Sequence, residues 1–133
     1  MSGDGPGSEA LTIFGMLFLA VLSVNQYPIE KTWARRNQLR KARLLEPSYL
    51  ESSSEEEIGQ GLVQAGIQRG NFITEILAER LHSVGKVIVE RGQERMREKL
   101  QSLGREDLRE LLGGAKGIGP VVIRNFLELR DAK

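Results

Sequence analysis

The chain has 133 residues, of which 40% are hydrophobic and 28% charged, and it contains no cysteine and a single histidine. This length fits one domain that can bury a core, and the missing cysteines exclude disulfides, Cys-ligated zinc and iron–sulfur clusters. One histidine also excludes a His-rich metal site, so we expect neither a metal nor a cofactor. The 19 Lys and Arg residues against 18 Asp and Glu residues leave a net charge of +1. A nucleic-acid partner therefore has to be argued from local charge rather than from bulk charge.

The N-terminal region predicts neither a membrane span nor a signal peptide. The apolar stretch from Leu11 to Val24 is too short to cross a bilayer as a helix. Met1–Ala10 contains two acids and no Lys or Arg, whereas a signal peptide begins with positive charge. We therefore expect an intracellular protein, in the cytoplasm, nucleoid or nucleus, with no membrane partner. Residues 1–8 are rich in Gly, Ser and Pro, and we expect them to form a disordered tail before a single domain over residues 9–133.

Apolar spacing along the chain predicts an all-α fold, a single compact bundle of six or seven helices. The first expected helix, about Glu9 to Asn25, is apolar on nearly every side and should therefore lie at the centre of the core. The other helices are expected at about Ile29–Leu44, Ser54–Ala65, Asn71–Glu90, Glu94–Leu103, Glu106–Leu112 and Pro120–Arg130. The segment Leu45–Ser53, which contains Pro47, is expected to be a loop.

Three local signals predict where helices begin and end. Ser54 stands three residues before Glu57, the spacing of a capping box in which each side chain bonds the other residue's backbone N–H. Gly66 is placed to close the same helix in a left-handed turn. Pro120 fits the first position of the last helix, where no N–H is needed.

The segment from Ile29 to Leu44 is the most basic part of the chain. It carries six cations against one acid, Glu30, and these cations are Lys31, Arg35, Arg36, Arg40, Lys41 and Arg43. Such a run of charge is explained either by a solvated surface or by contact with DNA. For the second interpretation we single out Arg35, Arg36 and Arg40.

Gly117–Ile118–Gly119 joins the last two expected helices and is the main functional signal. Glycines permit positive φ and close approach of the backbone, so with the start of the next helix they can present several N–H groups to an anion. Ile118 can anchor the turn in the core, and Lys116 adds attraction for phosphate. A plain glycine turn between packed helices is the alternative.

The sequence around this turn resembles the helix-hairpin-helix motif, in Leu111–Leu112, Lys116–Pro120 and Phe126–Leu127. Upstream, Phe18–Gln26 resembles the helix and following Gln-containing turn of helix-hairpin-helix DNA glycosylases. These are the base-excision enzymes typified by endonuclease III and by the alkylpurine and oxoguanine glycosylases. Glu55–Gly66 and Asn71–Gly85 resemble the next two helices of that family. The order and spacing of these segments extend from about Leu11 to Arg130.

The resemblance implies a DNA-binding role for particular residues. In that family the hairpin holds the backbone phosphates of duplex DNA through main-chain amides, contacts that position the protein without reading sequence. The enzymes hydrolyse the bond between a damaged base and its sugar after the base leaves the stack, and a turn side chain fills the space. Gln26, with Asn25 beside it, matches that turn, although ordinary turn chemistry explains both residues equally well. The hairpin residues assigned to DNA are Lys116, Gly117, Ile118, Gly119, Val121 and Arg124.

The chain departs from the family pattern where catalysis is concerned. Members with lyase activity carry a Lys two residues after the second hairpin glycine, where this chain has Val121, so a Schiff base is not expected. Alkylpurine-type members also lack that Lys, so its absence alone does not exclude base removal. An essential Asp lies well beyond the hairpin in the family, whereas Asp131 is the sole Asp after Gly119 and falls too early. Ile123 replaces a small residue of the family, and the helices that follow its hairpin are missing.

Three functions stay open at this point, and catalytic residues are unassigned. The first is a catalytically reduced relative of the glycosylases that binds intact, damaged or abasic duplex DNA. The second is an active monofunctional DNA glycosylase whose catalytic acid comes from elsewhere. The third is a helical scaffold for protein–protein contact, with an exposed apolar patch. We expect a second copy or a partner chain to cover the surface left open by the missing helices.

Overall fold

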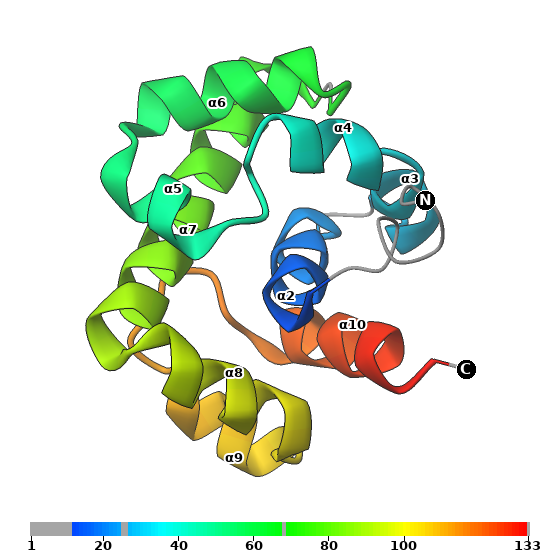
Figure 1. Ribbon diagram of the computed structural model, residues 1–133. Coiled ribbons are helices and arrows are strands. Elements are labelled where there is room, and N and C mark those ends of the chain that lie inside the picture. The colour runs from blue at the N-terminus through cyan, green and yellow to red at the C-terminus, as the bar shows by residue number, and fades with distance from the viewer. Residues whose placement is uncertain (1–11, 25–26, 68, 133) are drawn as a thin grey trace, which may run out of the picture.

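The computed structural model describes residues 12–24, 27–67 and 69–132. These residues form nine helices and no strand, which confirms the all-α class (Figure 1). The helices are α2 (Ile13–Leu22), α3 (Ile29–Ala34), α4 (Arg36–Lys41), α5 (Pro47–Ser52), α6 (Glu55–Gln64), α7 (Gly70–Arg91), α8 (Gln93–Ser102), α9 (Arg105–Leu111) and α10 (Pro120–Asp131). None of them is long and apolar enough to cross a membrane.

Helix α2 lies at the centre of the core, as predicted from its apolar sequence. All of its ten residues except Met16 are buried, and the Thr12 side chain caps its N-terminus by accepting from the Gly15 N–H at 3.0 Å. At its other end Asn125 of α10 donates its side-chain N–H to the Ser23 carbonyl at 2.8 Å. The Ser23 hydroxyl bonds to Leu19 and to Thr32 of α3. Both neighbouring helices are thereby fixed to the end of α2. The expected helix ends at Glu9 and Asn25 lie outside the described residues.

The single helix predicted over Ile29–Leu44 is wrong, because the chain forms α3 and α4 with a break at Arg35. Arg35 has φ −101° and ψ 10°, and its N–H bonds to the Thr32 carbonyl at 3.0 Å in a tighter turn. Each of these two helices has a single buried residue, Thr32 in α3 and Leu39 in α4. Helices in proteins are stabilised mainly by tertiary packing. Because so little of α3 and α4 is buried, packing does not keep one continuous helix across Arg35.

The loop predicted over Leu45–Ser53 is also wrong, because Pro47–Ser52 forms α5. Pro47 occupies the first position of that helix, where its missing N–H costs nothing. Pro47 and Leu50 are buried against α7. The close approach depends on Gly85, since a Cβ at that position would lie 2.8 Å from the Leu50 Cβ. The number of helices exceeds the six or seven expected for two reasons. Helix α5 forms where a loop was predicted, and α3 and α4 replace one predicted helix.

The capping box before α6 is confirmed. The Ser54 hydroxyl accepts from the Glu57 N–H and the Glu57 carboxylate accepts from the Ser54 N–H, each at 3.0 Å. Gly66 follows the helix with φ +94°, as the left-handed turn requires. The long helix α7 then packs against both α5 and α6. His82 on α7 has Nδ1 2.9 Å from the Leu50 carbonyl, so this histidine links α7 to α5.

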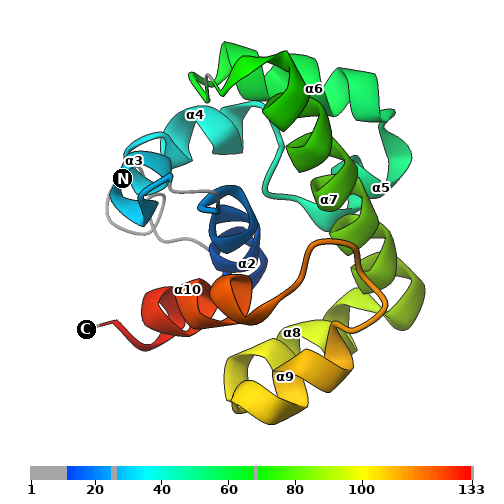
Figure 2. The ribbon, with the colours of Figure 1, turned by 180° about the vertical axis from the view of Figure 1, so that it is seen from behind.

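The linker between α9 and α10 forms part of the candidate site. Helices α8 and α9 lie at one end of the molecule in both ribbon views (Figures 1 and 2). Helix α10 packs against α2 and α9. Residues 112–119 leave α9, run beside α7 and return to the start of α10, drawn in orange in Figure 2. The two helices of the predicted hairpin are therefore separated by a segment whose middle lies against α7.

Candidate functional site

Gly117 lies beneath the side chain of Arg80 on α7. It has φ +81°, a conformation that glycine adopts at no steric cost. A Cβ here would come within 2.6 Å of both Cγ and Nε of Arg80. The positive φ therefore favours glycine at this position, and a larger residue would also require the Arg80 side chain to move. Arg80 reduces the space over Gly117 that a phosphate would need.

Lys116 is also bound to α7. Its backbone N–H donates to the Ser83 hydroxyl at 2.9 Å, and its ammonium lies 2.6 Å from a carboxylate oxygen of Glu79. The hydrogen bond and charge of Lys116 lower the pKa of Glu79, and the same contact raises the pKa of Lys116. The cation predicted to attract phosphate is thus already paired with an acid.

The first turn of α10 is open to solvent and uncapped. Gly119 is its N-cap, makes no side-chain cap, and has extended backbone with nothing within 4 Å of a Cβ placed there. The first N–H groups of an α-helix have no partner within the helix. In α10 this first turn contains Val121, whose side chain is 45% exposed. Arg124 lies one turn further on the same face and has no partner within the described ranges. The structure therefore brings Gly119, Val121 and Arg124 together, whereas Ile118 is half-buried and packs on the core.

A pocket of about 440 Å³ adjoins this turn. It lies between the end of α2, the start of α3 and α10, and it is lined by Ser23, Val24, Tyr27, Pro28, Ile29, Val121, Arg124 and Asn125. Asn25 and Gln26, predicted to enter DNA, lie outside the described residues. The residues on either side of them, Val24 and Tyr27, both line the pocket.

Two cations contact the Tyr27 ring at the edge of this pocket. The guanidinium of Arg69 lies 4.4 Å from the ring centroid and the ammonium of Lys31 lies 5.8 Å from it. Arg69 also donates to the Val24 carbonyl at 3.2 Å. Sequence analysis missed Tyr27 and Arg69 as site residues. The two are far apart along the chain, and no local motif predicts their contact.

The three arginines predicted from the basic segment are engaged elsewhere. Arg35 lies against Gly66 at the end of α6, where a Cβ would meet its guanidinium at 3.0 Å. Arg36 stacks on Trp33 with its guanidinium 4.3 Å from the ring centroid, and it donates to the Trp33 carbonyl. Arg40 is half-buried and has an interaction of its own. Arg36 is therefore held on α3 and Arg35 lies at the end of α6.

Base removal uses a carboxylate and, in the lyase route, a lysine. Among the described residues that line the pocket there is neither a carboxylate nor a lysine, and Val121 offers no nucleophile. Asp131, the acid considered from sequence, pairs with the neighbouring Arg130 at 2.9 Å. The described part of the chain also contains no cluster of acids and histidine that could hold a metal ion.

Comparisons with protein families, curated proteins and solved structures found no match for this chain. The resemblance to helix-hairpin-helix glycosylases therefore stays a prediction based on the residues quoted above.

Proposed function

We propose that the chain binds duplex DNA without cleaving it, and that the first turn of α10 holds a backbone phosphate. The observation that carries this proposal is the open, uncapped turn at Gly119 with the unpaired Arg124 on the same face. Backbone N–H groups at a helix N-terminus favour an anion, and a guanidinium forms short bidentate bonds with phosphate. Both donors are provided within six residues of one helix.

The pocket beside this turn supports contact with the DNA bases. Tyr27 offers an aromatic face, and Arg69 and Lys31 place positive charge around it. A ring of this kind stacks on an unpaired base, and the cations attract the neighbouring phosphates. We therefore propose that abasic or otherwise distorted duplex binds better than intact duplex, and that Asn25 and Gln26 enter the gap, as the sequence resemblance implies. Since no carboxylate stands among the described residues that line the pocket, we propose binding rather than base hydrolysis.

A matched pair of N-cap glycines tests this proposal. Gly119 before α10 and Gly104 before α9 both have extended backbone, no side-chain cap and open space at Cβ. Gly119→Val should block the approach of phosphate and weaken duplex binding about tenfold, the typical effect of losing a hydrogen bond to a charged group. Gly104→Val should leave binding unchanged. Fluorescence anisotropy of a labelled duplex measures both, and equal affinities of the two variants would refute the phosphate site.

A further inference from the structure

Helices α3 and α4 form a basic surface at the edge of the molecule. Each helix has a single buried residue, and both lie on the outside of the bundle in the two ribbon views (Figures 1 and 2). Arg35 and Lys41 are exposed, and neither forms an ion pair with any described residue. Glu30 is the single acid in the sequence from residue 29 to residue 43, against six cations. We call Trp33, Arg35, Arg36 and Lys41 the α3–α4 surface.

Trp33 provides this surface with an accessible aromatic ring. Trp33 is 38% exposed, and the guanidinium of Arg36 lies 4.3 Å from its ring centroid. Arg36 also donates to the Trp33 carbonyl at 2.9 Å, which fixes the arginine beside the ring. A guanidinium that stacks on an aromatic face keeps its positive charge. The same place therefore offers a ring on which a base can stack and a cation for the adjoining phosphate.

This combination fits a single nucleic-acid strand better than other polyanions. A tryptophan ring stacks on bases that are unpaired, whereas the bases of an intact duplex already stack on one another. A lipid surface fits less well, because a helix that lies on a membrane buries a broad apolar face in it. Trp33 is the one large hydrophobic side chain exposed on α3 and α4, both of which the structure describes in full.

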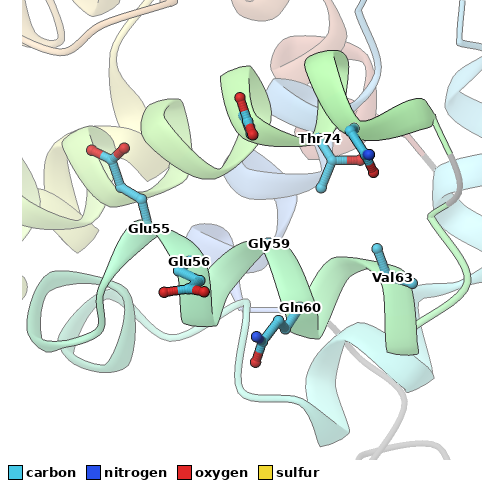
Figure 3. A pocket seen from close by; sticks show the side chains of 8 residues that line it. Glu55, Glu56, Gly59, Gln60, Val63 and Thr74 are labelled. Atoms are coloured by element: carbon cyan, nitrogen blue, oxygen red, sulfur yellow. The ribbon is translucent and has the colours of Figure 1, made fainter.

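A pocket of about 610 Å³ between α6 and the start of α7 carries the opposite charge (Figure 3). Among the described residues that line it, the charged ones are Glu55, Glu56 and Glu75. Carboxylates repel the phosphates of a nucleic acid. The pocket is therefore a poor path for a strand, in contrast to the α3–α4 surface.

We propose that the α3–α4 surface binds single-stranded DNA. One base stacks on Trp33, the Arg36 guanidinium contacts the neighbouring phosphate, and Arg35 and Lys41 attract the rest of the strand. Binding of this kind tolerates any sequence, because every base has a face that can stack. The surface contains no residue of α10, so strand binding does not depend on the duplex site. Only the choice of DNA rather than RNA rests on the proposed function.

The emission of Trp33 tests this inference directly, because the chain contains a single tryptophan. A deoxythymidine strand of about twelve nucleotides, within the usual length of such sites, should quench the emission and saturate. A strand of the same length without bases keeps the phosphates, and it should bind more weakly and leave the emission unchanged. An intact duplex should quench less than the single strand, because its bases are not free to stack on the ring.

Two substitutions of Trp33 separate the ring from the stability of the fold. Trp33→Leu keeps an apolar side chain without a ring and should weaken strand binding about tenfold, the scale of one lost base stack. Trp33→Phe keeps a ring and should stay within about threefold of the unmodified chain. Phe72→Leu is the matched control, because Phe72 is 73% exposed on α7 and lies outside the α3–α4 surface. Anisotropy of a labelled strand measures the affinities, and thermal unfolding shows whether both Trp33 variants are folded.

The charge of the surface is tested by salt dependence. Lys41→Gln should reduce the slope of log affinity against log salt by about 0.7, the value for one phosphate contact of a single strand. Lys86→Gln removes an exposed lysine of α7 and should leave the slope unchanged. Equal changes in the two variants would show attraction to the whole protein and would contradict a site on α3 and α4.

The outcomes separate this inference from the proposed duplex site. Saturable quenching by the single strand, lost in Trp33→Leu and kept in Trp33→Phe, supports the inference even if the chain binds no duplex. Binding without quenching, equal losses in Trp33→Leu and Phe72→Leu, or no binding at low salt would overturn it. Tighter binding of a uridine strand would overturn the choice of DNA. Binding to phosphatidylserine vesicles but not to the strand would make a lipid surface the occupant and overturn the inference.

Discussion

Lys116 in the linker and Glu79 on α7, which are 37 residues apart, form an ion pair with the ammonium 2.6 Å from the carboxylate. Together with the bond from the Lys116 N–H to Ser83, this pair fixes the linker to α7. The lysine that precedes the glycine turn is therefore paired with an acid of the same chain.

This pairing predicts that removing the Glu79 charge strengthens DNA binding. Glu79→Gln frees the Lys116 ammonium, and we expect the affinity for duplex DNA at low salt to rise about twofold to fivefold, the scale of an exposed ion pair. Glu90→Gln removes one exposed acid further along α7 and serves as the control. Fluorescence anisotropy measures both affinities. An equal gain in the two variants would attribute the effect to net charge rather than to Lys116.

The same pair predicts a pH dependence of stability. Glu79 has a lowered pKa because Lys116 hydrogen-bonds to it, and Lys116 has a raised pKa through the same contact. A lowered carboxyl pKa contributes stability above its unfolded value, about 4.3, which is lost as pH falls through the folded value. A raised lysine pKa contributes stability below its unfolded value, about 10.4, which is lost as pH rises through the folded value.

The chain should therefore unfold at a higher temperature than Glu79→Gln at neutral pH. The difference should shrink as pH falls below about 4.3 and again as pH rises above about 10.4, the ordinary pKa values of the two groups. Calorimetry of the two proteins across this range measures the difference. A constant gap at all pH values would show that the substitution acts through something other than the ion pair.

Two helical glycines should respond to alanine in opposite directions. A Cβ at Gly85 would lie 2.8 Å from the Leu50 Cβ and 3.1 Å from the Pro47 carbonyl, so Gly85→Ala should push α5 from α7 and destabilise the fold by about 1–3 kcal/mol. At Gly59 the nearest atom would be 3.7 Å away, so Gly59→Ala should stabilise α6 by about 0.5–1 kcal/mol. Denaturant unfolding measures both changes. A stabilising Gly85→Ala would contradict the packing of α5 on α7.

Helix ends that depend on residues within a single turn were predictable from the sequence. The capping box of Ser54 and Glu57, the positive φ of Gly66 and Pro120 at the first position of α10 all agree with the structure. Each of these signals involves residues at most three positions apart, so the sequence contains the whole interaction. The central place of α2 was predictable for a related reason, because a helix that is apolar on every side must be buried.

Features that depend on distant residues were not predictable in this way. Helix α5 is stabilised by packing against Gly85, and the break at Arg35 reflects how little of α3 and α4 is buried. In the candidate site, the glycine turn was recognised, but its cover by Arg80 was not. Nothing in the local sequence around the turn indicates a contact with α7, because that contact forms only when the chain folds.

We propose that the first turn of α10 and its adjoining pocket hold DNA. The most direct test is fluorescence anisotropy of intact and abasic duplexes at two salt concentrations, with the unmodified chain and Arg124→Gln. The account predicts binding that weakens with salt and favours the abasic duplex, and a smaller salt dependence in Arg124→Gln because one phosphate contact is lost. Absence of binding at low salt, or a salt dependence that Arg124→Gln leaves unchanged, would contradict it.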